Sequence, residues 1–205
     1  MKRVLRRRRR GNVAIEFALC AVFLIPLLLG SVTTGMSLNR TIQATQVCRD
    51  AGHMYVRFVD FSMPANKDII VRVARGLGMT RDGGNGVVIL SRIMFVGETQ
   101  CTEGGLSLAQ CTNYNRPVIT QRLTIGNQAL RSSNFGTPNP LLLDAKGEIA
   151  IADYLTDASV RADNFESLLA LQPGELAYVS EAYFATSDFN LGWWSGPGVY
   201  SRTIF

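Results

Sequence analysis

The chain has 205 residues, of which 47% are hydrophobic, and its 21 basic and 16 acidic residues give a formal net charge of +5. Seven of the basic residues lie in positions 1–10, so residues 11–205 hold 14 basic against 16 acidic residues. A nucleic-acid-binding protein carries a basic face on its folded body. Because the positive charge here is confined to a leader, we expect no nucleic-acid partner. Such a block beside a membrane span instead holds its end of the chain in the cytoplasm.

An uncharged run follows the basic block. Residues 17–39 contain no charged side chain, and Pro26 lies within them. As a helix this run would be about 35 Å long, enough to cross a hydrocarbon core of about 30 Å, with a kink at the proline. The sequence therefore predicts one transmembrane helix over residues 12–39, with the N-terminus cytoplasmic and the rest of the chain extracytoplasmic.

A single carboxylate, Glu16, lies at the start of the apolar segment. An ionisable side chain within a membrane span costs about 2.5 to 3.5 kcal/mol on insertion scales, so it normally has a functional partner. If the chain were cut after Gly11, the α-amine of Asn12 would become an ammonium group four positions from Glu16. The spacing predicts that such an amine neutralises this carboxylate.

These features resemble the class III signal of type IV pilins. In both, a glycine precedes an apolar helix, and a glutamate stands at the fifth position after that glycine. The run Val-Ala-Ile-Glu-Phe-Ala-Leu at positions 13–19 resembles the TadE/TadF-like minor pilins, or pseudopilins, of the tight-adherence (Tad/Flp, type IVc) system. The resemblance implies that residues 1–11 are a leader, which prepilin peptidase removes by cleaving between Gly11 and Asn12. It also implies that Glu16, followed by Phe17, guides assembly.

The same resemblance implies a structural and assembly component of a Tad-type pilus or secretion machine in the bacterial inner membrane, rather than an enzyme. Its partners would be prepilin peptidase, other pilin subunits, the Tad assembly platform and membrane lipid. The alternative is an uncleaved, single-pass, membrane-anchored extracytoplasmic binding protein or adhesin, because a plain signal-anchor has the same order of basic and apolar residues. Trp193 and Trp194 are the candidate partner surface for that alternative. An anchored hydrolase is a more distant one.

The helical pattern continues beyond the membrane span. Val47, Ala51, Met54, Tyr55 and Phe58 recur at steps of three and four residues, which predicts a core-facing helix face. We expect this continuation to cover residues 40–61 and to end before Pro64. A second helix is expected over residues 65–77, with Gly78 as its C-terminal cap.

The rest of the chain, in a head of residues 62–205, has the pattern of strands. A run rich in β-branched and apolar residues predicts a strand at 87–96. Further strands are expected at 118–125, at 176–184, where the residue types alternate, and at 199–205. The expected fold class is α+β and pilin-like, with a small antiparallel sheet. The stretches from Gly174 and from Val199 also resemble the head of TadE-type proteins. Residues 126–173 match no part of that pattern, and we expect one or two short helices within 153–171.

The four cysteines fall into two groups. Cys101 and Cys111 flank a connection rich in Gly, Ser and Gln between two expected strands, and we predict that they form a disulfide; two free thiols are the alternative. Cys20 and Cys48 are interpreted as small helix residues. The chain has one histidine, His53, and no second cysteine or histidine pair at metal-ligand spacing, so we expect no metal site, cofactor or catalytic residues.

Overall fold

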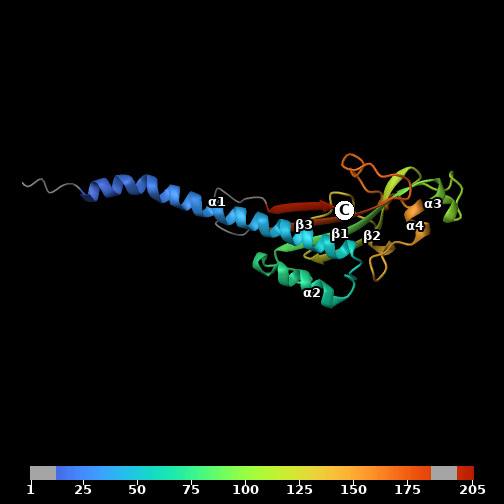
Figure 1. Cartoon of the computed structure of the whole chain (residues 1–205), viewed down its shortest axis with the longest axis horizontal. Coiled ribbons are helices and arrows are strands. Elements are labelled where there is room, and N and C mark those ends of the chain that lie inside the picture. Colours follow the sequence, from blue (N-terminus) through green and yellow to red (C-terminus); the bar gives the residue numbers. More distant parts are fainter. Residues whose placement is uncertain (1–12, 186–197) are drawn as a thin grey trace, which may run out of the picture. The chain divides into compact units, whose positions relative to one another are not determined.

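A computed structural model of the protein describes residues 13–185 and 198–205. The chain divides into two compact units, residues 1–39 and residues 40–205. Its elements are α1 (Val13–Val56), α2 (Pro64–Val73), η1 (Arg75–Leu77), β1 (Gly86–Val96), α3 (Glu98–Glu103), β2 (Arg116–Gly126), η2 (Pro140–Leu142), α4 (Ile151–Thr156), η3 (Ala158–Val160), β3 (Leu176–Phe184) and β4 (Val199–Ile204) (Figure 1). The fold is α+β, with a long N-terminal apolar helix and a head that contains a small sheet.

The four strands form one antiparallel sheet in the order β2-β1-β3-β4. All four expected strands are confirmed. The β-branched residues concentrated in β1 and β2 pack well in a pleated sheet. The pairing of β1 with β2 shifts between Arg92 and Ile93. At this irregularity the Arg92 Nε donates a hydrogen bond to the Thr120 hydroxyl at 3.0 Å. The side chain thereby fixes the register where the backbone ladder is interrupted.

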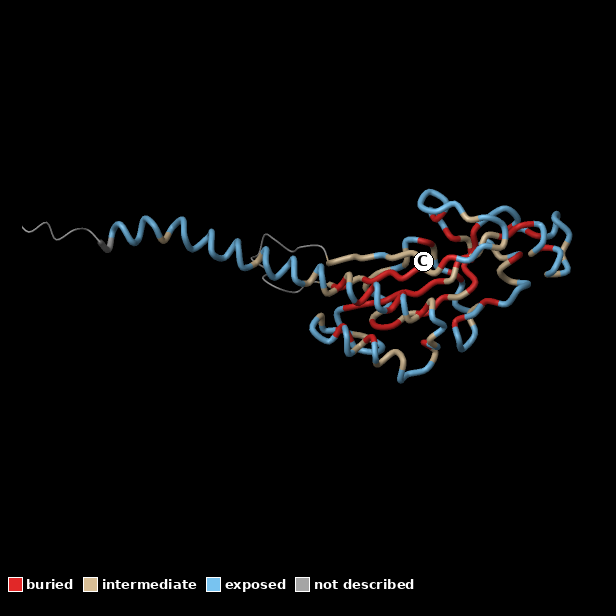
Figure 2. The backbone as a smooth tube through the Cα atoms, in the orientation of Figure 1, coloured by how far each residue is buried: buried red, intermediate tan, exposed pale blue. Residues whose placement is uncertain are grey.

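One face of the sheet packs against the second half of α1. The helix residues Ala44, Val47, Cys48, Ala51 and Tyr55 are all buried, at the steps of three and four that the sequence predicted. The Cys48 thiol donates to the Ser180 carbonyl of β3 at 3.2 Å, so this free cysteine is a packing residue. Figure 2 shows the buried residues concentrated in the strands and in the adjoining turns of α1.

The helix ends at Val56, five residues before the predicted end at Phe61. The chain turns there because Phe58 adopts a left-handed conformation with φ 62. The Phe58 N–H donates to the Tyr55 carbonyl at 3.0 Å and the Val59 N–H to the Met54 carbonyl at 3.1 Å, which is the Schellman pattern that ends helices. The expectation that Phe58 faces the core is therefore wrong, since its side chain is 79% exposed.

Phe61 is the aromatic residue that enters the core after this turn, and it is fully buried. Pro64 does not end the first helix, which has already ended at Val56; it is the first residue of α2. That position suits proline because the first helical N–H groups have no partner within the helix. The expected second helix is confirmed as α2 followed by η1, and Gly78 caps it in the left-handed conformation with φ 71.

Replacing Phe58 by glycine is expected to stabilise the protein. The left-handed conformation costs a non-glycine residue roughly 1 kcal/mol or more, and glycine adopts it without this cost. The Phe58 ring contributes little burial in return, because it is 79% exposed. We expect F58G to raise the free energy of unfolding by about 1 kcal/mol, measured by urea unfolding of the full chain in detergent.

The matched control for this variant is F58A, which removes the ring and retains the left-handed strain. It should be no more stable than the natural chain. Equal stability of F58G and F58A would show that backbone strain at this position does not limit stability.

The other face of the sheet is covered by residues 127–171. This segment forms a second core in which Phe135 and Phe165 are fully buried and meet edge to face, with their ring centroids 5.5 Å apart. It also contains the short helices α4 and η3, as expected, although α4 begins at Ile151, before the expected range of 153–171. Residues 126–173 are therefore an integral layer of the head.

Candidate functional site

The first turns of α1 hold the charged residue that the sequence singled out. Glu16 lies in the first turn of α1 and is exposed, and Phe17 beside it is 73% exposed. A carboxylate in the first turn is favoured by the positive end of the helix dipole. Gly11 and Asn12 lie outside the described residues, so cleavage between them stays a prediction.

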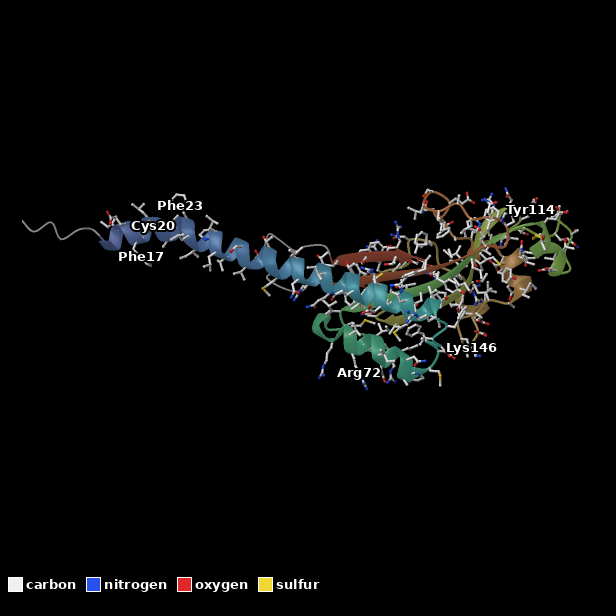
Figure 3. The ribbon with its side chains drawn as sticks, in the orientation of Figure 1. Phe17, Cys20, Phe23, Arg72, Tyr114 and Lys146 are labelled. Carbon is white, nitrogen blue, oxygen red and sulfur yellow. A yellow bond between two sulfur atoms is a disulfide. The ribbon has the colours of Figure 1, made fainter. Side chains whose placement is uncertain are left out.

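The helix surface after Glu16 is apolar on every side. Phe17 and Phe23, which extend from α1 on different sides, are 73% and 72% exposed (Figure 3). The hydroxyls in this stretch are satisfied within the helix, since Ser31 donates to the Leu28 carbonyl at 2.8 Å and Thr34 donates to the Gly30 carbonyl at 2.8 Å. Internal pairing of polar groups is what a lipid environment requires.

Among the described residues, one helix is long and apolar enough to cross a membrane: Ile15–Val56. This length and composition agree with single-pass membrane anchoring. Residues 11–53, which cover both Glu16 and the apolar run, match a known protein family described as TadE-like protein. This segment is TadE-like. No curated protein and no solved structure matches the chain.

The TadE-like segment confirms the resemblance that positions 13–19 indicated. It begins at Gly11 and ends at His53, one helical turn before α1 ends. It therefore includes residues of both compact units: the apolar run, and the buried face that contacts the sheet. The head beyond His53 lies outside the matched residues.

The head has a groove where α1 ends, which the sequence did not predict. It has a volume of about 220 Å³, and its lining includes Tyr55, Phe58, Arg92, Gln121 and Tyr178. The Tyr55 and Phe58 rings both meet Tyr178 edge to face, with centroids 5.3 and 6.2 Å apart. Burial raises the pKa of Tyr55, and its hydroxyl donates to the Gln121 carboxamide at 2.8 Å. The tyrosine is therefore a neutral packing residue.

Charged residues also border this groove. Arg92 pairs with Glu148 at 3.5 Å, and the Gln121 amide donates to the Lys146 carbonyl at 3.0 Å. These polar groups bond to one another, which is typical of a structural contact. Among the described residues, no group of three His, Cys, Asp or Glu side chains could hold a metal ion.

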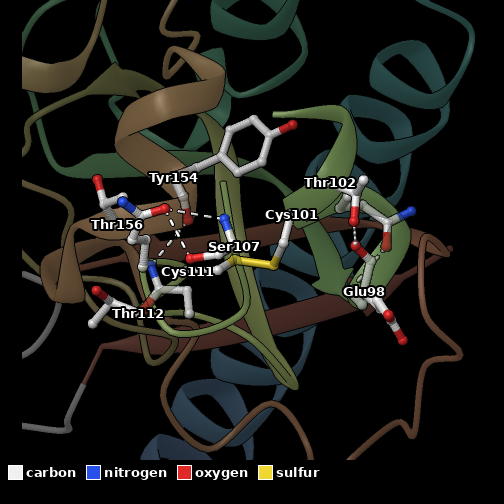
Figure 4. Close-up of a disulfide and its surroundings, with 12 residues drawn as sticks. Glu98, Cys101, Thr102, Ser107, Cys111, Thr112, Tyr154 and Thr156 are labelled. Carbon is white, nitrogen blue, oxygen red and sulfur yellow. Dashed lines mark hydrogen bonds between the residues drawn. A yellow bond between two sulfur atoms is a disulfide. The ribbon is translucent and has the colours of Figure 1, made fainter. Parts of the chain in front are cut away.

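The predicted disulfide joins Cys101 of α3 to Cys111, with their Cα atoms 5.9 Å apart (Figure 4). Both residues are buried in the second core. The neighbouring Asn113 is also buried, and its side-chain amide donates to the Tyr154 carbonyl at 2.9 Å. Its carboxamide oxygen accepts a bond from the Arg161 Nε at 2.8 Å. The disulfide thus closes a loop that is tied to α4 and its following turn.

Removing this disulfide is expected to destabilise the head. A closed loop of about ten residues restricts the unfolded chain, and its loss costs on the order of 2 to 3 kcal/mol. We expect C101S/C111S to lower the free energy of unfolding by that amount in urea unfolding of the full chain. Cys20→Ser is the control, because Cys20 is an exposed free cysteine in α1, and it should leave stability unchanged. A reductant should lower the stability of the natural chain and leave C101S/C111S unaffected.

A buried carboxylate on β3 was also missed by sequence analysis. Glu181 is 2% exposed and accepts hydrogen bonds from the Ser133 hydroxyl, from the Asn134 N–H at 3.0 Å and from the Tyr200 hydroxyl at 2.7 Å. Burial, followed by the bond to this carboxylate, raises the pKa of Tyr200. The cluster joins β3 and β4 to the segment that covers the sheet, so its role is structural.

The candidate partner surface at Trp193 and Trp194 lies outside the described residues and stays a prediction. His53 is exposed, and its ring lies against the Phe205 ring with centroids 4.8 Å apart. The candidate functional site is therefore the start of α1, where Glu16 precedes the apolar surface.

Proposed function

We propose that this protein is a minor pilin or pseudopilin, a structural and assembly component of a Tad-type pilus or secretion machine. The observation that carries the proposal is that the TadE-like segment begins at Gly11 and contains Glu16 at the start of an exposed apolar helix. The exposed apolar surface needs lipid or other helices to cover it, and an assembling pilin exchanges the first for the second. The protein has no enzymatic role in this proposal.

The proposed mechanism begins in the bacterial inner membrane, with the basic leader in the cytoplasm and the head extracytoplasmic. Prepilin peptidase removes residues 1–11 and leaves the α-amine of Asn12 as an ammonium group. The Tad assembly platform then moves the helix out of the lipid and into contact with other pilin subunits. Glu16 pairs with an N-terminal amine in the assembled bundle, which offsets the cost of placing its charge among apolar side chains.

Intact-mass spectrometry of the protein purified from its native membrane tests the processing step. We expect a mass that lacks residues 1–11, and we expect Gly11→Leu to retain them. Gly30→Leu is the matched control, because it makes the same substitution at a glycine of the apolar run that no neighbouring atom crowds, and it should be cleaved normally. An uncut N-terminus in a host with active prepilin peptidase would support the uncleaved adhesin instead.

A further inference from the structure

We propose that the head also contacts the membrane directly, through a basic surface formed by Arg72 of α2 and Arg75 of η1. The ligand is the phosphate group of anionic phospholipids on the extracytoplasmic side. This inference rests on the proposed membrane insertion of α1 and goes beyond it, because it assigns a lipid-binding role to the folded head. We call Arg72, Val73 and Arg75 the juxtamembrane surface.

The position of η1 follows from its contact with α1. Arg40 is the first charged residue after the uncharged run, so chain connectivity places it at the membrane–water boundary. Arg40 lines a hollow of about 190 Å³ together with Gly76, Leu77 and Gly78. One turn further along α1, the Gln43 side chain lies against Gly76. The end of η1 is therefore held beside the part of α1 that leaves the membrane.

The juxtamembrane surface is open to solvent. Arg72 and Arg75 are both exposed, and Val73 is 48% exposed. Figure 3 shows the Arg72 side chain extending away from α2. Asp68 lies one turn before Arg72 and forms an ion pair with Arg81, whose Nε donates to the Asp68 carboxylate at 2.8 Å. Arg72 and Arg75 lie three residues apart, at the end of α2 and the start of η1, so an anion beside both would be attracted by two charges.

The distribution of charge along the head favours an anionic partner at this end. Residues 40–85 hold seven basic and four acidic residues, whereas residues 86–205 hold seven basic and eleven acidic residues. Residues 40–85, which include Arg72 and Arg75, are thus net positive, and residues 86–205 are net negative. An anionic surface would attract the first segment more than the second.

Arginine suits this ligand. Its planar guanidinium donates two parallel hydrogen bonds to phosphate oxygens and retains its charge at all relevant pH values. A basic residue near an anionic membrane surface gains about 1 kcal/mol, or roughly fivefold in the equilibrium for contact. Extraction of α1 into a filament would break these contacts, so the surface would favour the membrane-inserted form of the subunit.

The experiment reconstitutes the full chain in nanodiscs made of phosphatidylcholine alone or of phosphatidylcholine mixed with phosphatidylglycerol. Hydrogen–deuterium exchange is then measured over residues 72–78. We expect slower exchange with phosphatidylglycerol, by roughly fivefold for each arginine in contact, and we expect high salt to reduce the difference. In R72Q/R75Q the two nanodiscs should give equal exchange.

The matched control is R116Q/K146Q, which removes the same charge from exposed positions of the net negative part. It should retain the full difference between the two lipids. Equal exchange of the natural chain in both lipids would overturn the proposal, and so would a lipid difference that persists in R72Q/R75Q. The nanodiscs contain no assembly machinery, so failure here leaves the proposed pilin function standing. Failure of Glu16-dependent assembly would in turn leave this lipid contact standing.

Discussion

Glu16→Ala is expected to abolish incorporation of the protein into filaments while leaving its membrane insertion and its cleavage intact. Removing a charge from the span lowers the cost of insertion by about 2.5 to 3.5 kcal/mol, so a defect in assembly cannot arise from poor insertion. The cleavage position lies five residues earlier, at Gly11. The loss should therefore appear at the assembly step alone, where the carboxylate would meet an N-terminal amine.

The measurement compares the amount of subunit in sheared filaments with the amount in the membrane fraction. We expect the filament signal of E16A to fall below detection and its membrane signal to equal that of the natural chain. Glu166→Ala is the matched control, because it removes an exposed carboxylate from the head and should assemble normally. Normal incorporation of E16A would contradict the proposed role of Glu16 and favour the uncleaved anchor.

The parts of the fold that the sequence predicts well are those with a strong local pattern. The uncharged run from Phe17 to Asn39 permits only a lipid- or helix-covered segment, and the family match over residues 11–53 supports that interpretation. Strands β1 and β2 follow from runs rich in β-branched residues, and β3 follows from alternation along its sequence. The disulfide follows from two cysteines on one short connection, and the structure joins Cys101 to Cys111.

The end of α1 could not be predicted because its signal is absent from the sequence. A Schellman cap normally uses glycine at the left-handed position, whereas this chain has Phe58 there. The helical spacing of apolar residues in the sequence therefore continues beyond the residue at which the helix ends. The groove beside Phe58 was missed for the same reason, since it exists only because the chain turns at this residue.

The buried cluster around Glu181 could not be predicted because its partners are distant in sequence. A glutamate in an alternating strand is expected on a solvent face. Here the segment 127–136 covers that face and supplies Ser133 and the Asn134 N–H to the carboxylate. No local pattern encodes which loop covers which face, so the burial of Glu181 became visible only in the structure.

Glu181→Ala is expected to be among the most destabilising single substitutions in the head. Arg122 is 8% exposed, and its Nε has no hydrogen-bond partner among the described residues. Burial lowers the pKa of the Arg122 guanidinium to about 10, and the charge of Glu181 opposes that shift. The guanidinium therefore stays protonated at neutral pH. It donates to the Gly136 carbonyl at 3.0 Å, and the Glu181 charge favours its protonated form without a direct ion pair among the described residues.

Removing a buried acceptor costs about 1 to 3 kcal/mol for each donor that it leaves unpaired, and Arg122 would also lose the favourable field of a nearby carboxylate. The Tyr200 hydroxyl and the Asn134 N–H would lose their acceptor as well. We expect E181A to lower the free energy of unfolding by that amount in urea unfolding of the full chain, with Glu166→Ala unchanged. In the double variant E181A/R122M the loss should be smaller than the sum of the two single losses, because no buried charge remains. Strictly additive losses would show that Glu181 and Arg122 do not stabilise one another.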